Sequence, residues 1–122
     1  MLYDEKWDYR SSIARNLMGA ARAIRTYGWS HRGGMQDEQG RLCIHGAIGM
    51  AVDGQLWPLS EENVATCQAM ADYLREQGYS HIAGYGCAHW NNAYERTEQE
   101  MLDGIKGAAE RAEAKQLQFT NV

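Results

Sequence analysis

The chain has 122 residues, of which 44% are hydrophobic and 23% charged, as expected for one globular domain with a modest core. This composition excludes a wholly disordered chain, and no apolar run approaches the roughly 20 residues that span a bilayer. The N-terminal MLYDEKWDYR is charged and aromatic, without the apolar stretch of a signal peptide. We therefore expect a single cytoplasmic domain over residues 1–122, frayed at 1–7 and 116–122.

Charge is distributed unevenly along the chain. The net charge of −4 combines +2 over residues 1–41 with −6 over residues 42–122. Arginines without acidic neighbours in sequence make residues 9–36 mildly basic. Phosphate-driven binding usually rests on a much stronger positive field, so the composition argues against a nucleic-acid partner.

Helical spacing dominates the pattern, and the first helix is predicted from Asp8 or Tyr9 to Tyr27. One face of it is apolar, and Ser11 or Asp8 can cap its start. Gly28 stands where a helix-ending glycine is expected. Residues 28–41, with three glycines and many polar side chains, are predicted to form a long loop.

Three further segments follow. The apolar stretch LCIHGAIGMAVDG (residues 42–54) fits a short buried helix better than a strand, although runs of this length are ambiguous. Ser60 begins a helix that ends at Gly78, with Cys67 on its apolar face. Residues 79–96 are aromatic and irregular. Thr97 and Glu100 then form a T-x-x-E capping box before a closing helix to about Lys115, and its apolar stripe contains Met101, Leu102, Ile105, Ala108, Ala109 and Ala112.

These elements predict an all-α fold, a compact bundle of about four helices with two long loops that contain glycine and aromatic residues. Three motifs follow one another along the chain: Gly28-Trp29, Cys43-x-x-Gly46-Ala47-Ile48, and Trp90-Asn91-Asn92-x-x-x-Arg96-Thr97-x-x-Glu100-Met101-Leu102. On these motifs the chain resembles a family of small uncharacterised proteins from actinobacteria and their phages, over about residues 13–112. Asn92 replaces the Asp of the family pattern, which argues against an acid/base or metal role there. The resemblance implies a shared fold and origin, and it implies no reaction.

Two C-x-H units, Cys43-Ile44-His45 and Cys87-Ala88-His89, contain four side chains that can ligate zinc. Structural zinc sites typically use C-x2–4-C and H-x3–5-H spacing. If residues 43–45 are helical, Cys43 and His45 point about 200° apart and cannot chelate one ion. We therefore expect no metal and no other cofactor, with these four residues as the zinc alternative.

Cys43 is also a candidate nucleophile. Near a helix N-terminus its pKa would fall, with His89 or His45 as base and Asn91 orienting the imidazole. The alternative is a buried structural thiol, the usual state of free cysteine. With three cysteines, Cys43, Cys67 and Cys87, at least one is unpaired, and we expect all three to be reduced.

Trp90, Asn91 and Arg96 form the other candidate site. Beside a helix N-terminus they could hold an anion. The structural interpretation has Trp90 anchoring its loop on the core and Asn91 satisfying backbone groups of a turn.

Aromatic side chains exceed what so small a core can cover, and exposed Trp, Tyr and Arg are typical of interfaces. The aromatic residues in question are Tyr3, Trp7, Tyr9, Trp57, Tyr79 and Tyr85, and we expect some of them to be exposed. We therefore predict a non-enzymatic accessory protein, encoded by a phage, that binds a protein partner in the host cytoplasm or self-associates. The alternative is a small enzyme or ligand-binding protein with Cys43, His89, Asn91 and Arg96 in one pocket.

Overall fold

The computed structural model describes residues 8–79 and 81–120. Within these ranges the chain forms five helices and no strand: α1 (Ser12–Tyr27), α2 (Ile44–Val52), α3 (Glu61–Glu76), α4 (Ala88–Asn91) and α5 (Glu98–Thr120). The predicted all-α class is confirmed. The structure adds α4, a single turn inside the segment expected to be irregular. Of the fraying predicted at residues 1–7 and 116–122, the parts at 1–7 and 121–122 lie outside the described residues, whereas residues 116–120 are helical.

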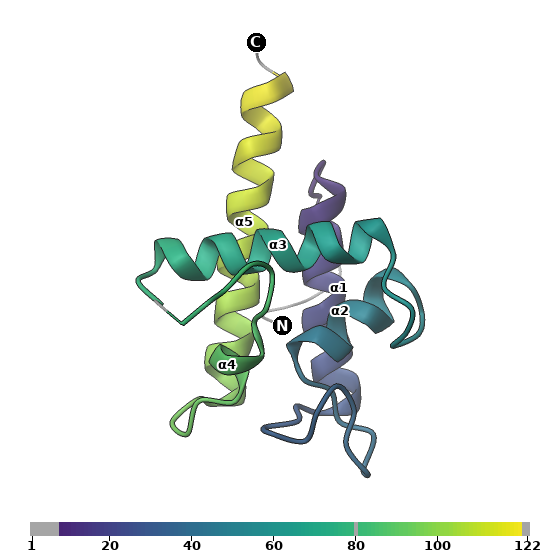
Figure 1. The fold of residues 1–122 in the computed structure, drawn as a ribbon. Coiled ribbons are helices and arrows are strands. Elements are labelled where there is room, and N and C mark those ends of the chain that lie inside the picture. The colour runs from purple at the N-terminus through teal and green to yellow at the C-terminus, as the bar shows by residue number, and fades with distance from the viewer. Residues whose placement is uncertain (1–7, 80, 121–122) are drawn as a thin grey trace.

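The core is built on an antiparallel pair of long helices. α1 and α5 run side by side, and α3 crosses both (Figure 1). α2 packs against α1 and α3, while the short α4 lies beside the first turns of α5 (Figure 1). The buried stripe of α5 is the predicted one, from Met101 to Ala112, and Cys67 is buried as expected. α3 also buries two polar residues that the pattern did not predict, Asn63 and Thr66.

The helix starts follow local sequence signals. The Ser11 hydroxyl accepts a hydrogen bond from the backbone N–H of Ala14, and Ser60 does the same for Asn63. At α5 both bonds of the predicted capping box form between Thr97 and Glu100. α5 then continues to Thr120, beyond the predicted end near Lys115.

The apolar segment after the first loop is the predicted helix, α2, and its glycines explain how it can be buried. A Cβ atom on Gly46 would overlap the backbone carbonyl of Met35. A Cβ on Gly49 would lie 2.9 Å from the carbonyl oxygen of Gln55. The loops on either side of α2 therefore lie directly on its backbone.

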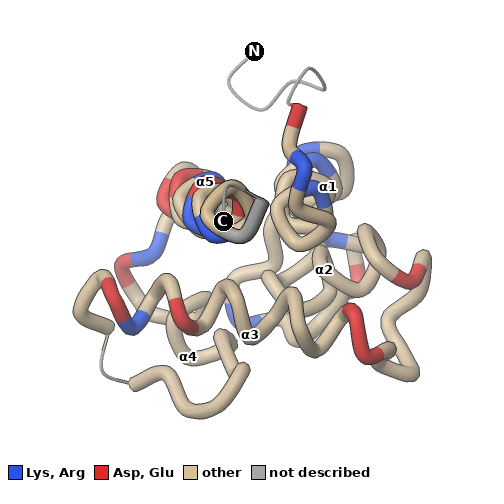
Figure 2. Tube along the Cα trace, turned by 90° about the horizontal axis from the view of Figure 1, so that it is seen from above, with Lys and Arg blue, Asp and Glu red and all other residues tan. Residues whose placement is uncertain are grey.

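Figure 2 shows Lys and Arg positions, and no acidic position, along α1, whereas α5 has both signs of charge. Arg15, Arg22 and Arg25 of the predicted basic segment are exposed on α1. No helix of the described chain is both long and apolar enough to cross a membrane.

Candidate functional site

The two main sequence motifs meet through the side chain of Asn91, which is fully buried. Its Oδ1 accepts hydrogen bonds from Trp29 Nε1 and from the backbone N–H of Ile44, both at 3.0 Å. Its Nδ2 donates to the Ser30 carbonyl at 3.1 Å and to Asn92 Oδ1 at 2.9 Å. All four hydrogen-bonding positions of the amide are used. Asn91 therefore fastens the loop after α1 and the start of α2 to α4.

Cys43 is the N-cap of α2, and its Sγ accepts a hydrogen bond from the Gly46 N–H at 3.5 Å. The thiol is at a helix N-terminus, as the catalytic interpretation requires, but the residue is only 6% exposed. Burial raises the pKa of Cys43 and outweighs the hydrogen bonds from the backbone that would lower it. The thiolate that a nucleophile needs is therefore disfavoured at neutral pH.

His45 bonds through both ring nitrogens to other parts of the fold. The Cys87 backbone N–H donates to Nε2 at 2.9 Å, and Nδ1 lies 3.4 Å from Cys67 Sγ. Because a backbone N–H can only donate, Nε2 must be unprotonated, so the ring proton is assigned to Nδ1 and points at the sulfur. Burial lowers the pKa of His45 and raises those of Cys67 and Cys87 to about 12. His45, Cys67 and Cys87 are therefore uncharged at neutral pH, which fits a structural role.

The structure gives Cys43, His89, Asn91 and Arg96 different neighbours. Asn91 reaches the N-terminus of α2 next to Cys43, whereas His89 is exposed with its ring centroid 5.2 Å from that of His81. Of the four zinc candidates, His45 meets the backbone N–H of Cys87, whereas His89 is exposed beside His81. Across residues 8–79 and 81–120, no group of three or more His, Cys, Asp or Glu side chains is placed to hold a metal ion.

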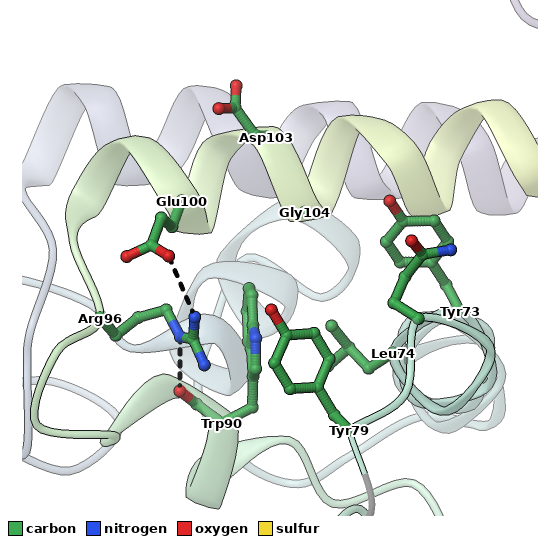
Figure 3. Close-up of a pocket in the computed structure, with 9 residues that line it drawn as sticks. Tyr73, Leu74, Tyr79, Trp90, Arg96, Glu100, Asp103 and Gly104 are labelled. Carbon is green, nitrogen blue, oxygen red and sulfur yellow. Dashed lines mark hydrogen bonds and ion pairs between the residues drawn. The ribbon is translucent and has the colours of Figure 1, made fainter.

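Arg96 and Trp90, from the other candidate site, pack against each other. The Arg96 guanidinium lies over the Trp90 ring, 4.8 Å from its centroid, and 5.2 Å from the Tyr79 centroid. Its Nε donates to the Trp90 carbonyl at 3.0 Å, and its Nη1 pairs with Glu100 at 3.3 Å (Figure 3). Arg96 thereby ties the end of α4 to the first turn of α5.

These side chains line a cavity of about 280 Å³ between α3, α4 and α5 (Figure 3). We call it the Trp90 pocket, and its lining residues are Tyr73, Leu74, Gln77, Tyr79, Trp90, Arg96, Glu100, Asp103 and Gly104. Gly104 makes room for the indole, because a Cβ there would lie 2.8 Å from a ring carbon of Trp90. Trp90 itself is 4% exposed, and within the part of the chain that the structure describes its Nε1 has no hydrogen-bond partner.

A comparison with family models matches residues 8–111 to a family of unknown function, DUF6197. The chain belongs to this family. No curated protein and no solved structure matches the chain. The match covers most of the described residues, and it assigns no reaction or ligand to the Trp90 pocket.

The sequence motifs of this DUF6197 protein contain Trp90, Arg96 and Glu100, and Tyr79 was among the aromatic residues considered for an interface. The sequence did not indicate that Tyr73 of α3, or Tyr79 from the turn after it, would meet these residues in one pocket. One signal was available. Gly104 and Gly107 both interrupt the amphipathic helix α5, and a glycine inside a helix often marks close approach by another group.

Proposed function

We propose that this protein is a small, non-enzymatic accessory factor that binds a protein partner through the Trp90 pocket. The observation that carries the proposal is the composition of this pocket, in which Tyr79, Trp90 and Arg96 lie together beside open space. Tyr, Trp and Arg are the side chains most enriched at interface hot spots. Tyr79 is 38% exposed, so a partner can contact it directly.

The size of the pocket favours a protein partner over a free small molecule. Its volume of about 280 Å³ lies just under the roughly 300–1,000 Å³ typical of small-molecule sites. It suits one inserted side chain or a short stretch of backbone. Further exposed aromatic residues widen the surface available to a partner: Trp57, Tyr85 and Tyr94.

The alternative, an enzyme that uses Cys43, is less well supported. Its thiol is buried with a raised pKa, and His89 lies with His81 instead. The origin of the protein in an actinobacterial phage, and therefore a host protein as its partner in the cytoplasm, rests on the sequence motifs alone. A second copy of the chain is the other partner that this surface would suit.

The test is capture of a partner by the immobilised protein and by two matched tyrosine variants. Tyr79→Ala removes a side chain that lines the pocket. Tyr27→Ala removes an exposed tyrosine at the C-terminal end of α1 that does not line it. We expect the protein either to capture a specific polypeptide from an actinobacterial lysate or to form a dimer, detected by light scattering. Tyr27→Ala should retain this binding, and Tyr79→Ala should lose it. Equal retention by both variants would refute the pocket, and a monomer that captures nothing would refute the proposal.

A further inference from the structure

The indole N–H of Trp90 is a buried hydrogen-bond donor that lacks an acceptor in the described part of the chain. Trp90 is 4% exposed, and its Nε1 has no hydrogen-bond partner among the described residues. An unsatisfied buried donor costs about 1–3 kcal/mol, and native structures contain few of them. In Figure 3 the nitrogen lies on the edge of the indole that faces Tyr79, within the lining of the pocket. An acceptor that enters the pocket would satisfy it.

Arg96 supplies a second donor at the same place. Its Nε and Nη1 are used by the Trp90 carbonyl and Glu100, and Nη2 makes no hydrogen bond to any described residue. The Arg96 side chain is only 11% exposed, so water has limited access to it. Two donors of different residues thus border one cavity, and both lack an acceptor from the protein.

Charge decides what kind of acceptor fits. The guanidinium is already neutralised by Glu100, and a second carboxylate, Asp103, also lines the cavity. The Asp103 carboxylate itself points away from Trp90, Tyr79 and Arg96 (Figure 3). An incoming anion would therefore meet no uncompensated cation and would lie beside the Glu100 carboxylate, so its charge would be disfavoured. An incoming cation would compete with Arg96 for the faces of Trp90 and Tyr79 and would leave the indole N–H unsatisfied.

We propose that the Trp90 pocket recognises a neutral amide carbonyl, from the backbone or an Asn or Gln side chain of the partner. The carbonyl oxygen accepts hydrogen bonds from Trp90 Nε1 and Arg96 Nη2. This inference rests on the proposed function, because it names the group by which a protein partner is held. Tyr79, in edge contact with Trp90 at 6.2 Å between ring centroids, covers the donor in the free protein. An N–H···π contact there would be weak and open to replacement by a carbonyl.

The test is a titration of the ¹⁵N-labelled protein with three small probes, followed at the tryptophan indole signals. N-methylacetamide presents a neutral amide, acetate an anion and tetramethylammonium a cation. We expect N-methylacetamide to shift the Trp90 indole signal saturably in the millimolar range. The indoles of Trp29, already bonded to Asn91, and of the exposed Trp57 serve as internal controls that should stay unchanged.

A stronger response of the Trp90 indole to acetate or tetramethylammonium would overturn the inference, and so would no response or an equal shift of Trp57. A Trp90→Phe variant keeps an aromatic ring but removes the N–H donor together with part of the ring, and its binding is followed at the Gly104 backbone amide. We expect its affinity for N-methylacetamide to fall at least about fivefold, as loss of one hydrogen bond implies. Unchanged affinity would refute the indole as donor.

The outcomes separate this inference from the proposed function. If the amide probe fails while Tyr79→Ala still abolishes partner capture, the pocket binds a partner by another group and only the inference falls. If the amide probe binds as expected while no partner or second copy is found, the proposed function falls and the amide site stands.

Discussion

Replacement of Asn91 by alanine is expected to destabilise the protein strongly. The substitution deletes an acceptor for two N–H groups and a donor for the Ser30 carbonyl. Ile44 and Ser30 are both fully buried, so their backbone groups would be left without partners away from water. Trp29 is only partly buried, and its indole N–H can turn to water at lower cost.

The magnitude follows from these three groups. A buried backbone group left unsatisfied costs about 1–3 kcal/mol, and a partly exposed one less. The sum for Asn91→Ala is therefore about 3–5 kcal/mol, a large share of the roughly 5–15 kcal/mol that stabilises a typical domain. The fold should survive only marginally, with the start of α2 and the loop after α1 loosened first.

Urea unfolding followed by circular dichroism measures this loss. With a slope of about 1–3 kcal/mol per molar urea for a small domain, the midpoint should fall by roughly 2 M. Asn92→Ala is the matched control, because Asn92 is half-buried and its side chain accepts a single bond from Asn91. That control should lose no more than about 1 kcal/mol. A similar small loss for Asn91→Ala would refute the account of Asn91 as the tie between the two motifs.

Three further predictions concern single residues. Burial lowers the pKa of His45 from its ordinary 6.5, so the unfolded chain takes up the proton first as pH falls. The stability this histidine contributes is complete above about 6.5 and lost below it. The free energy of unfolding in urea should therefore drop more in the wild type than in His45→Gln between about pH 7.5 and about pH 5.5, and equal drops would contradict the assignment. Gly46→Ala should lower the melting temperature by several degrees in calorimetry, because its Cβ would overlap the carbonyl of Met35; an unchanged melting temperature would show that the loop moves freely. Asn92→Asp should leave urea stability within about 0.5 kcal/mol, since a carboxylate oxygen can accept the same bond from Asn91, and a loss above about 2 kcal/mol would indicate that its amide nitrogen matters.

The sequence predicted those parts of the fold that depend on neighbouring residues. Ser11, Ser60 and Thr97 cap their helices within three residues along the chain, so the pattern alone locates them. The apolar stripe of α5 follows from helical spacing in the same way.

The site was predicted less completely, because its bonds join distant segments. Asn91 satisfies the N–H of Ile44, 47 residues away in sequence, and no local pattern indicates that pairing. His45 likewise meets Cys87 and Cys67 instead of forming a C-x-H chelate with Cys43. The Trp90 pocket requires Tyr79, from the turn after α3, to meet α4 and α5. Its composition became visible only once the helices were packed.

The most direct test of the central claim, that the Trp90 pocket is a binding surface, is the affinity of the captured partner for matched variants. Isothermal titration of that partner should give a dissociation constant at least about tenfold higher for Tyr79→Ala than for the wild type, as removal of an interface hot spot implies. Tyr27→Ala should bind as the wild type does. If Tyr79→Ala binds the partner with wild-type affinity, the pocket is not the binding surface.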